Sequence, residues 1–310
     1  MSKASRAIVK ADNSRLTIAD AKAKADQIID RLDIKDETRQ DYKARIGLFM
    51  AYMGKQGLNN DTFLNFKREL ASRTDLAISS KNKYLTTARI FLKELNRLGL
   101  LQTDISQNVK AFKQSKKHKQ DGINDSEIKT ITDKIRALPI TPQTTRLKAI
   151  VALLTLQGLR QIEVIRLDVK DLDFVSKTAL ILGKGRDDKE IINLQPETIR
   201  ALQDFIKANK IKDGAVFTSQ SNNGRHNRLT TRALRGIVKQ TLNELGIDKT
   251  THAFRHYFTT KLIKTYKGDL LEVAQYTRHK SLEMLQVYND NIKREADLPR
   301  FYETFKEVSF

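Results

Sequence analysis

A polar, basic stretch without hydrophobic periodicity, AFKQSKKHKQD at residues 111–121, divides the chain in two. Apolar residues recur at regular spacing on both sides of it, so each side can bury a core of its own. A chain of 310 residues is long enough for two ordinary domains. We therefore predict an N-terminal domain over residues 1–112, a linker over 113–121 and a second domain over 122–310.

Residues 17–98 are predicted to be helical, because apolar residues repeat there every three or four positions. One stripe consists of Tyr42, Ile46, Phe49 and Met53. A second stripe consists of Tyr84, Ala88, Phe91, Leu95 and Leu98. Each stripe is about one helix face wide, which favours a small all-helical bundle.

Positive charge lies on the polar faces of these helices and in the linker. The formal net charge is +20, which favours a polyanionic partner, with nucleic acid first and an anionic membrane second. The membrane is disfavoured, because the sequence has no long apolar run and no signal-peptide pattern near Met1. For a single helix a solvated face explains such charge better, but several basic helices beside a basic linker favour DNA. The cations expected to contribute salt-dependent DNA affinity are Arg39, Lys43, Lys81, Lys83, Lys116 and Lys117.

The sequence contains no cysteine. Disulfides, thiol nucleophiles and thiolate metal sites are therefore excluded. This composition also fits a reducing compartment, and we expect a cytoplasmic, DNA-associated protein.

The second region is predicted to be α+β and mostly helical, so the whole chain is expected to be mainly α with a small β-sheet. Its expected elements are a helix over 143–157, a hairpin with strands at 178–182 and 190–194, a short strand at 215–218, and helices from residue 230 onward.

Two short stretches of this region place cations at turns. Arg160 and Glu163 stand three residues apart in GLRQIE, within pairing distance if the turn is helical. Lys184 lies between two glycines at the expected hairpin tip, where it can approach a ligand closely. Taken alone, each is an ordinary surface feature.

Two further stretches carry histidine and tyrosine. In THAFRHYFTTKLI, one helical stripe contains His252, Arg255 and His256. The two histidines have the spacing of a zinc pair, but the arginine between them favours an anion over a metal. His256 could equally be a core histidine. His279 precedes a helix on which Tyr288 follows about two turns later, where a lone tyrosine is usually core or rim.

Together, in this order, the four stretches resemble the tyrosine recombinase, or phage integrase, family. The family pattern is an Arg in G-L-R-x-x-E, a hairpin G-K-G Lys, H-x-x-R-H, a His in a G-H-x-S-like motif, and a Tyr nine residues beyond it. The matching positions are Arg160, Glu163, Lys184, His252, Arg255, His279 and Tyr288. The resemblance covers most of residues 121–290. The N-terminal region looks like the family's SAM-like core-binding domain.

The chain departs from the family pattern at three positions. Gln161 replaces a small apolar residue, Phe254 replaces a usual Leu, and Arg278 stands where a Gly commonly precedes the His. A glycine there would allow a left-handed backbone, so Arg278 bears on the local geometry. No departure removes a side chain of the matched set.

The residue types suit phosphoryl transfer. Arg160 and Arg255 can clamp nonbridging phosphate oxygens with charge-assisted, bidentate bonds. Tyr288 can supply the attacking oxygen, and guanidiniums favour its phenolate while His252 accepts the proton.

The resemblance adds the remaining roles. Lys184 would protonate the leaving 5′-oxygen and His279 would bond a phosphate oxygen. Glu163 would orient Arg160 or His252, and His256 would support the site. The resemblance implies a site-specific recombinase that forms a 3′-phosphotyrosyl intermediate, with no cofactor and no essential metal.

The implied partners are double-stranded DNA with a specific target site and a homotetramer on two such sites, with room for accessory proteins. Leu298, Phe301, Phe305 and Val308 in the tail would either dock into a neighbouring protomer or pack on their own domain. Three alternatives stay open: a type IB topoisomerase, a non-catalytic DNA-binding regulator and, more remotely, a metal nuclease. Integration, excision and resolution are not separable from these residues.

Overall fold

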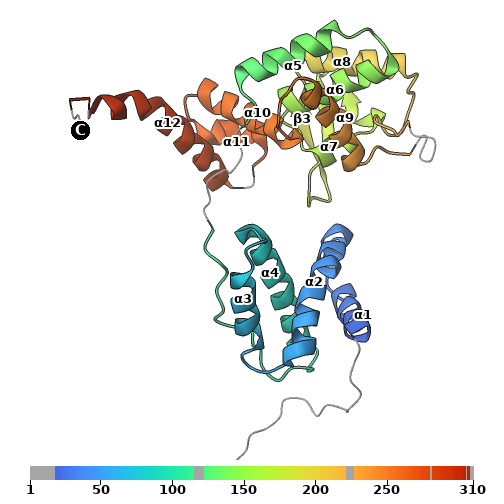
Figure 1. Ribbon diagram of the computed structural model, residues 1–310. Helices are drawn as coiled ribbons and strands as arrows, with labels where there is room; N and C mark the ends of the chain where they lie inside the picture. Colours follow the sequence, from blue (N-terminus) through green and yellow to red (C-terminus); the bar gives the residue numbers. More distant parts are fainter. Residues whose placement is uncertain (1–17, 115–121, 221–226, 280, 305, 308–310) are drawn as a thin grey trace, which may run out of the picture. The chain divides into compact units, whose positions relative to one another are not determined.

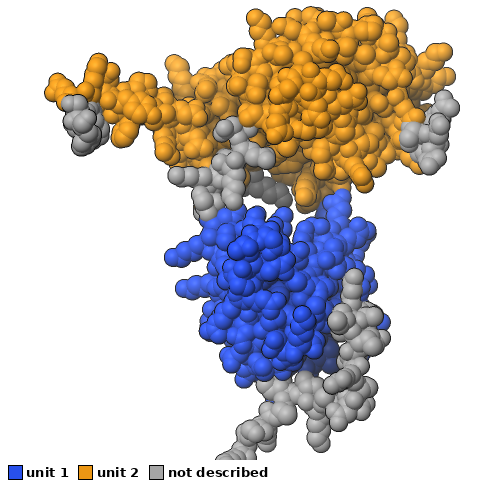
Figure 2. All heavy atoms as spheres, in the orientation of Figure 1, with its two compact units in different colours: residues 1–115 blue, residues 116–310 orange. Residues whose placement is uncertain are grey.

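The computed structural model describes residues 18–114, 122–220, 227–279, 281–304 and 306–307. The chain forms two compact units, Met1–Ser115 and Lys116–Phe310, which Figure 2 draws in separate colours. Four residues singled out above lie outside the described residues: Lys116, Lys117, Phe305 and Val308.

The first unit is a bundle of helices, as the apolar stripes predict (Figure 1). Its helices are α1 (Ile18–Asp30), α2 (Asp36–Gln56), α3 (Thr62–Ser72) and α4 (Ile78–Arg97). Phe49 of α2 lies in the core, where its ring makes edge contacts with Phe63, Phe66 and Phe91 at centroid distances of 6.5, 4.9 and 6.4 Å. Such edge-to-face pairs stabilise a core beyond the burial of their area.

The prediction that Lys81 faces DNA is wrong. Its side chain is only 6% exposed, and its Nζ donates a hydrogen bond to the Ala71 carbonyl at 3.0 Å. Ala71 lies in the last turn of α3, where backbone carbonyls have no partner within the helix and attract a cation. Lys81 therefore joins α3 to α4, whereas Lys83, two residues further along α4, is exposed.

Two other cations of the first unit have acidic neighbours. Lys43 Nζ lies 2.7 Å from an Asp30 carboxylate oxygen, and Arg39 pairs with Asp36. Arg39 also donates to the backbone carbonyls of Leu32 and Ile34, both at 3.1 Å. Arg39 thus anchors the turn between α1 and α2.

The second unit is mostly helical with one small sheet. Its elements are α5 (Asp125–Ala137), α6 (Pro142–Leu156), α7 (Gln161–Ile165), the 3₁₀ helix η1 (Val169–Asp171), β1 (Leu172–Asp173), β2 (Thr178–Leu182), β3 (Lys189–Asn193), α8 (Pro196–Ala208), α9 (Thr231–Glu244), α10 (Thr251–Thr265), α11 (Leu270–Thr277) and α12 (Leu282–Thr304). Within the described residues, no helix combines the length and apolar composition needed to cross a bilayer.

The sheet is antiparallel, in the order β1-β2-β3. Leu180 pairs with Ile191, and both side chains are exposed, while Ala179 and Ile181 point into the core. The predicted hairpin is therefore confirmed, with its turn at residues 183–188. The strand expected at 215–218 is not formed. Those residues make only isolated bridges, from Ala215 to Asp168 and from Thr218 to Arg228.

Helix α6 forms the centre of the second core, and the chain turns sharply after it. Gly158 has φ +58, and a Cβ there would stand only 2.2 Å from the Phe258 ring of α10. Only glycine fits both the left-handed backbone and this close approach. The turn brings the start of α7 next to α10, and that junction holds the candidate site.

Candidate active site

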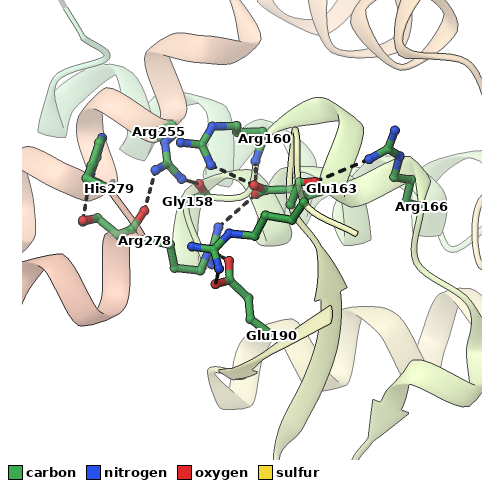
Figure 3. Close-up of polar contacts among 11 residues, drawn as sticks. Gly158, Arg160, Glu163, Arg166, Glu190, Arg255, Arg278 and His279 are labelled. Atoms are coloured by element: carbon green, nitrogen blue, oxygen red, sulfur yellow. Dashed lines mark hydrogen bonds and ion pairs between the residues drawn. The ribbon is translucent and has the colours of Figure 1, made fainter. Parts of the chain in front are cut away.

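Six of the seven matched side chains of the second unit line one open cavity of about 510 Å³. They are Arg160, Lys184, His252, Arg255, His279 and Tyr288. They come from the start of α7, the β2–β3 turn, α10, the loop after α11, and α12. Segments separated by more than a hundred residues thus share one site, and Figure 3 shows the polar contacts that hold part of it together.

Glu163 fixes the position of Arg160. Arg160 is the N-cap residue of α7, and Glu163 is fully buried three residues later. One carboxylate oxygen accepts from Arg160 Nη1 at 2.8 Å, and the other accepts from the Arg160 backbone N–H at 2.8 Å. Backbone and guanidinium are therefore held by the same carboxylate (Figure 3), as the i, i+3 spacing predicted.

Arg255 is held by backbone carbonyls. It projects from α10 and is 2% exposed. Its Nη1 donates to the Gly158 carbonyl at 2.6 Å, and its Nη2 donates to the Thr277 carbonyl. Burial, aided by the nearby charge of Arg160, lowers the pKa of Arg255 to about 10. The guanidinium still carries its charge at neutral pH, in a setting that strengthens its attraction for an anion.

His279 is held neutral. Its Nδ1 lies 2.8 Å from the Thr277 hydroxyl. Burial, followed by the charges of Arg255, Arg160 and Arg278, lowers the pKa of His279 to about 3. A neutral imidazole keeps one N–H, so His279 can donate a hydrogen bond to an oxyanion without carrying charge itself.

Tyr288 is buried on α12. It is 6% exposed and belongs to an apolar cluster with Ile263, Val273 and Leu285. Its ring lies 5.1 Å from that of His256. Burial raises the pKa of Tyr288 to about 12, against the opposing effect of Arg255 and Arg160. The phenol is therefore protonated near neutrality and needs a base before it can attack.

The two histidines of α10 lie edge to face, with ring centroids 4.8 Å apart. His252 is exposed on the cavity side, whereas His256 is buried. Among the described residues, no group of three or more histidine or acidic side chains could hold a metal ion.

Lys184 is exposed on the β2–β3 turn. The base of this turn is held by Arg166, whose Nη1 lies 3.5 Å from the Gly183 carbonyl. Gly185 has φ +75 and open space around its Cβ position, so it serves the turn without packing against a neighbour. Lys184 also lines the cavity.

The departures from the family pattern have clear places in the structure. Gln161 hydrogen-bonds the Thr251 hydroxyl, which ties α7 to the start of α10. Phe254 is fully buried in the main core. Arg278 does adopt the left-handed conformation, with φ 54 and ψ 41.

The role of the Arg278 side chain was not predicted from the sequence. Its Nη2 donates to Glu163 at 2.9 Å, and its Nε lies 3.4 Å from a carboxylate oxygen of Glu190 on β3. Arg278 and Glu190 line the cavity. The sequence signal for it was the Arg that stands where a Gly commonly precedes the His. That signal concerned the backbone conformation and said nothing of the side chain.

Comparison with known proteins shows which family and which solved structures the chain resembles. The sequence model described as "Phage integrase family" matches residues 122–295. Tyrosine recombinase slr0733 of Synechocystis sp. is 27% identical over 235 residues, covering 74% of this chain and 73% of that protein. Tyrosine recombinase XerC of Shewanella amazonensis is 28% identical over 270 residues, covering 86% of this chain and 80% of the relative.

Solved structures share the fold. The post-cleavage complex of XerH site-specific recombinase bound to palindromic difH substrate aligns with a TM-score of 0.72 and 18% identity, over 92% of this chain and 84% of that one. A lambda integrase dimer bound to a COC′ core site aligns with a TM-score of 0.65 and 14% identity, over 87% of this chain and 76% of that one. At these identities the likeness concerns the fold.

Proposed function

This chain belongs to the phage integrase family, and we propose that it is a site-specific recombinase that cleaves and rejoins DNA through Tyr288. The observation that carries the proposal is the convergence of Arg160, Arg255 and a buried tyrosine on one cavity. The relatives named tyrosine recombinase support the same reaction.

The guanidiniums of Arg160 and Arg255 bind the scissile phosphate. Each is fixed by hydrogen bonds before DNA arrives, Arg160 by Glu163 and Arg255 by the carbonyls of Gly158 and Thr277. Such preorganised charge stabilises a pentavalent phosphorus better than flexible side chains do, because no reorganisation is needed at the moment of reaction. His279 adds a neutral donor to the same oxygens.

Tyr288 attacks phosphorus through its phenolic oxygen. Its raised pKa means that the proton must leave as the O–P bond forms, and His252 on the cavity wall is the proposed acceptor. The new bond joins the tyrosine to the 3′-phosphate, and the P–O5′ bond breaks. Lys184 donates the proton that turns the leaving oxygen into a 5′-hydroxyl.

The reaction is balanced without water or an outside energy source. One phosphoester bond is exchanged for another, so a 5′-hydroxyl from a second strand can attack the phosphotyrosine and release the enzyme. Attack by the original strand restores the starting DNA, whereas attack by a partner strand recombines it.

The proposed partner is double-stranded DNA, in keeping with the DNA complexes of the structural neighbours. We assign the helical unit of residues 1–112 to holding DNA and residues 122–310 to the chemistry. Exchange between two DNA sites requires four active sites, so we propose that the protein acts as a homotetramer. Accessory proteins could join this complex, and we propose that it acts on DNA in the cytoplasm.

The substitution Tyr288→Phe tests the nucleophile. The variant lacks the attacking oxygen but keeps the ring, so we expect normal DNA binding and no covalent protein–DNA adduct. The substrate is a pool of nicked suicide duplexes with a randomised centre, on which a cleaved strand cannot be rejoined and adducts accumulate.

Peptide mapping of the wild-type adduct should place the label on Tyr288. An adduct formed by the Phe variant, or a label on another residue, would disprove the assignment. Relaxation of supercoiled plasmids that lack any selected site would favour a topoisomerase instead.

A further inference from the structure

The Arg278 guanidinium also lies in the wall of the active-site cavity. Arg278 ends α11 with a left-handed backbone, and its side chain is only 5% exposed. For a residue with a Cβ this backbone conformation is unfavourable, so it persists only where other contacts compensate. The contacts of its side chain show what it holds.

Arg278 bridges two carboxylates from separate elements (Figure 3). Its Nη2 lies 2.9 Å from Glu163 on α7, and its Nε lies 3.4 Å from Glu190 on β3. Glu190 also pairs with Arg186 at 3.4 Å. The guanidinium is therefore anchored at two positions and buried.

The contact with Glu163 matters for Arg160. One oxygen of Glu163 accepts from the Arg160 guanidinium, and the other accepts from Arg278 and from the Arg160 backbone. Arg278 is the partner of Glu163 that does not belong to Arg160, so rotation of the carboxylate would also break a bond to a separate element. The direction of the Arg160 side chain is set by the plane of this carboxylate, since the Arg160 guanidinium donates to it.

Arg278 is less suited to a phosphate than Arg160 or Arg255, because its charge already faces two carboxylates. Its side chain is 5% exposed against 32% for Arg160, and Arg255, which is similarly buried, donates to uncharged carbonyls instead. Burial lowers the pKa of Arg278, and the charges of Glu163 and Glu190 oppose that shift. The positive charge of Arg278 is thus balanced by carboxylates of the protein itself.

We propose, resting on the recombinase function above, that Arg278 is a positioning residue, which fixes Glu163 and through it aims Arg160 at the scissile phosphate. The residue acts through Arg160 and does not touch DNA. Arg278 directly precedes His279 in the chain. One short loop therefore supplies His279 as a phosphate ligand and Arg278 as the support of Arg160.

The test compares two variants at this position. Arg278→Gly removes the guanidinium and also relieves the left-handed backbone. Arg278→Lys keeps a buried cation but lacks the fork that spans both carboxylates. We expect both to form the covalent adduct about 10- to 100-fold more slowly on the randomised suicide duplexes, because a misplaced reactive group loses that much rate, with DNA affinity nearly unchanged.

Lys177→Gly is the matched control. Lys177 has φ 55, is exposed and does not line the cavity. This change therefore removes a cation from the same backbone conformation elsewhere in the unit. It should leave the adduct rate at the wild-type level.

A double substitution separates support from direct contact. If Arg278 acts through Arg160, Arg278→Gly should slow the Arg160→Lys variant much less than it slows the wild type. Slowing by the same factor in both backgrounds would overturn the proposal and indicate an independent contact with the phosphate.

A readout without DNA keeps this inference apart from the proposed function. The Nε–H NMR signal of Arg160, identified by its loss in Arg160→Lys, should report a rigid side chain in the wild type and in Lys177→Gly. It should report a mobile one in Arg278→Gly. Unchanged rigidity would refute the positioning role, whereas a wild-type protein that forms no adduct would refute the recombinase function alone.

Discussion

Three of the guanidiniums that line the cavity, those of Arg160, Arg255 and Arg278, are held by two kinds of partner. Arg160 and Arg278 donate to the carboxylate of Glu163. Arg255 donates to two carbonyl oxygens, which carry no net charge. The charge of Arg255 is therefore less compensated, and Arg255 should contribute the larger share of the attraction for a phosphate.

Burial, together with the same cations, makes His279 a source of acid sensitivity. Its pKa is about 3 in the folded protein against an ordinary value of 6.5. Between these values the unfolded chain binds a proton that the folded chain does not. The stabilising contribution is thus complete above pH 6.5 and is lost as the pH falls toward 3.

We expect His279→Gln to reduce this pH dependence. We expect the free energy of unfolding, measured in urea, to fall less steeply between pH 7.5 and 4 in the variant than in the wild type. The two slopes should differ by less than the value for one bound proton. Parallel curves for the two proteins across that range would contradict the buried, neutral histidine.

At the residue scale, local contacts were predictable and distant ones were not. The Arg160–Glu163 pair follows from a three-residue spacing on a helical turn. The Arg278–Glu163 bond joins residues 115 positions apart, and nothing in a linear pattern specifies such a meeting. Lys81 was misplaced for the same reason, since the sequence does not reveal which helix end will lie beside it.

Among the elements, the junction of α6 and α7 has the tightest steric constraint on the site. Gly158 combines φ +58 with a Cβ position 2.2 Å from the Phe258 ring. Its carbonyl also accepts from Arg255. A side chain at Gly158 would therefore disturb both the packing of α10 and the support of Arg255, a proposed phosphate ligand.

We expect Gly158→Ala to lower the free energy of unfolding by about 2–5 kcal/mol, of which about 1–2 kcal/mol reflects the left-handed backbone and the rest displacement of the Phe258 ring. Gly214→Ala is the control, because Gly214 has φ +69 but nothing within 4 Å of its Cβ position. The Gly214→Ala variant should lose only the about 1–2 kcal/mol that reflects the left-handed backbone. Equal losses in denaturant unfolding would argue against a steric role for Phe258.

Elements with strong periodicity were predicted well. The apolar stripes of α2 and α4 and the hairpin β2–β3 were correctly assigned, because burial of one face imposes a regular spacing. Residues 215–218 were assigned to a strand from a short apolar run. They make isolated bridges instead, since buried loops and strands share that composition.

For the whole molecule, the net charge of +20 predicts DNA affinity that falls steeply with salt. Lys83→Gln should reduce the slope of log affinity against log salt concentration by about 0.9, the value for one phosphate contact. Lys81→Gln should leave that slope unchanged, because Lys81 is buried against α3, and should instead lower the unfolding midpoint. Fluorescence anisotropy with a labelled duplex would measure both slopes, and identical salt slopes for the two variants would contradict this distinction.

Helix α12 follows every other element that lines the cavity. Ribosomes therefore synthesise the proposed phosphate-binding residues before Tyr288, the proposed nucleophile. A reading frame stopped just ahead of residue 282 would encode the other lining residues without Tyr288, and would also leave Ile263 and Val273 without Leu285 and Tyr288 to cover them. Such truncated products should therefore make no stray breaks in the genome.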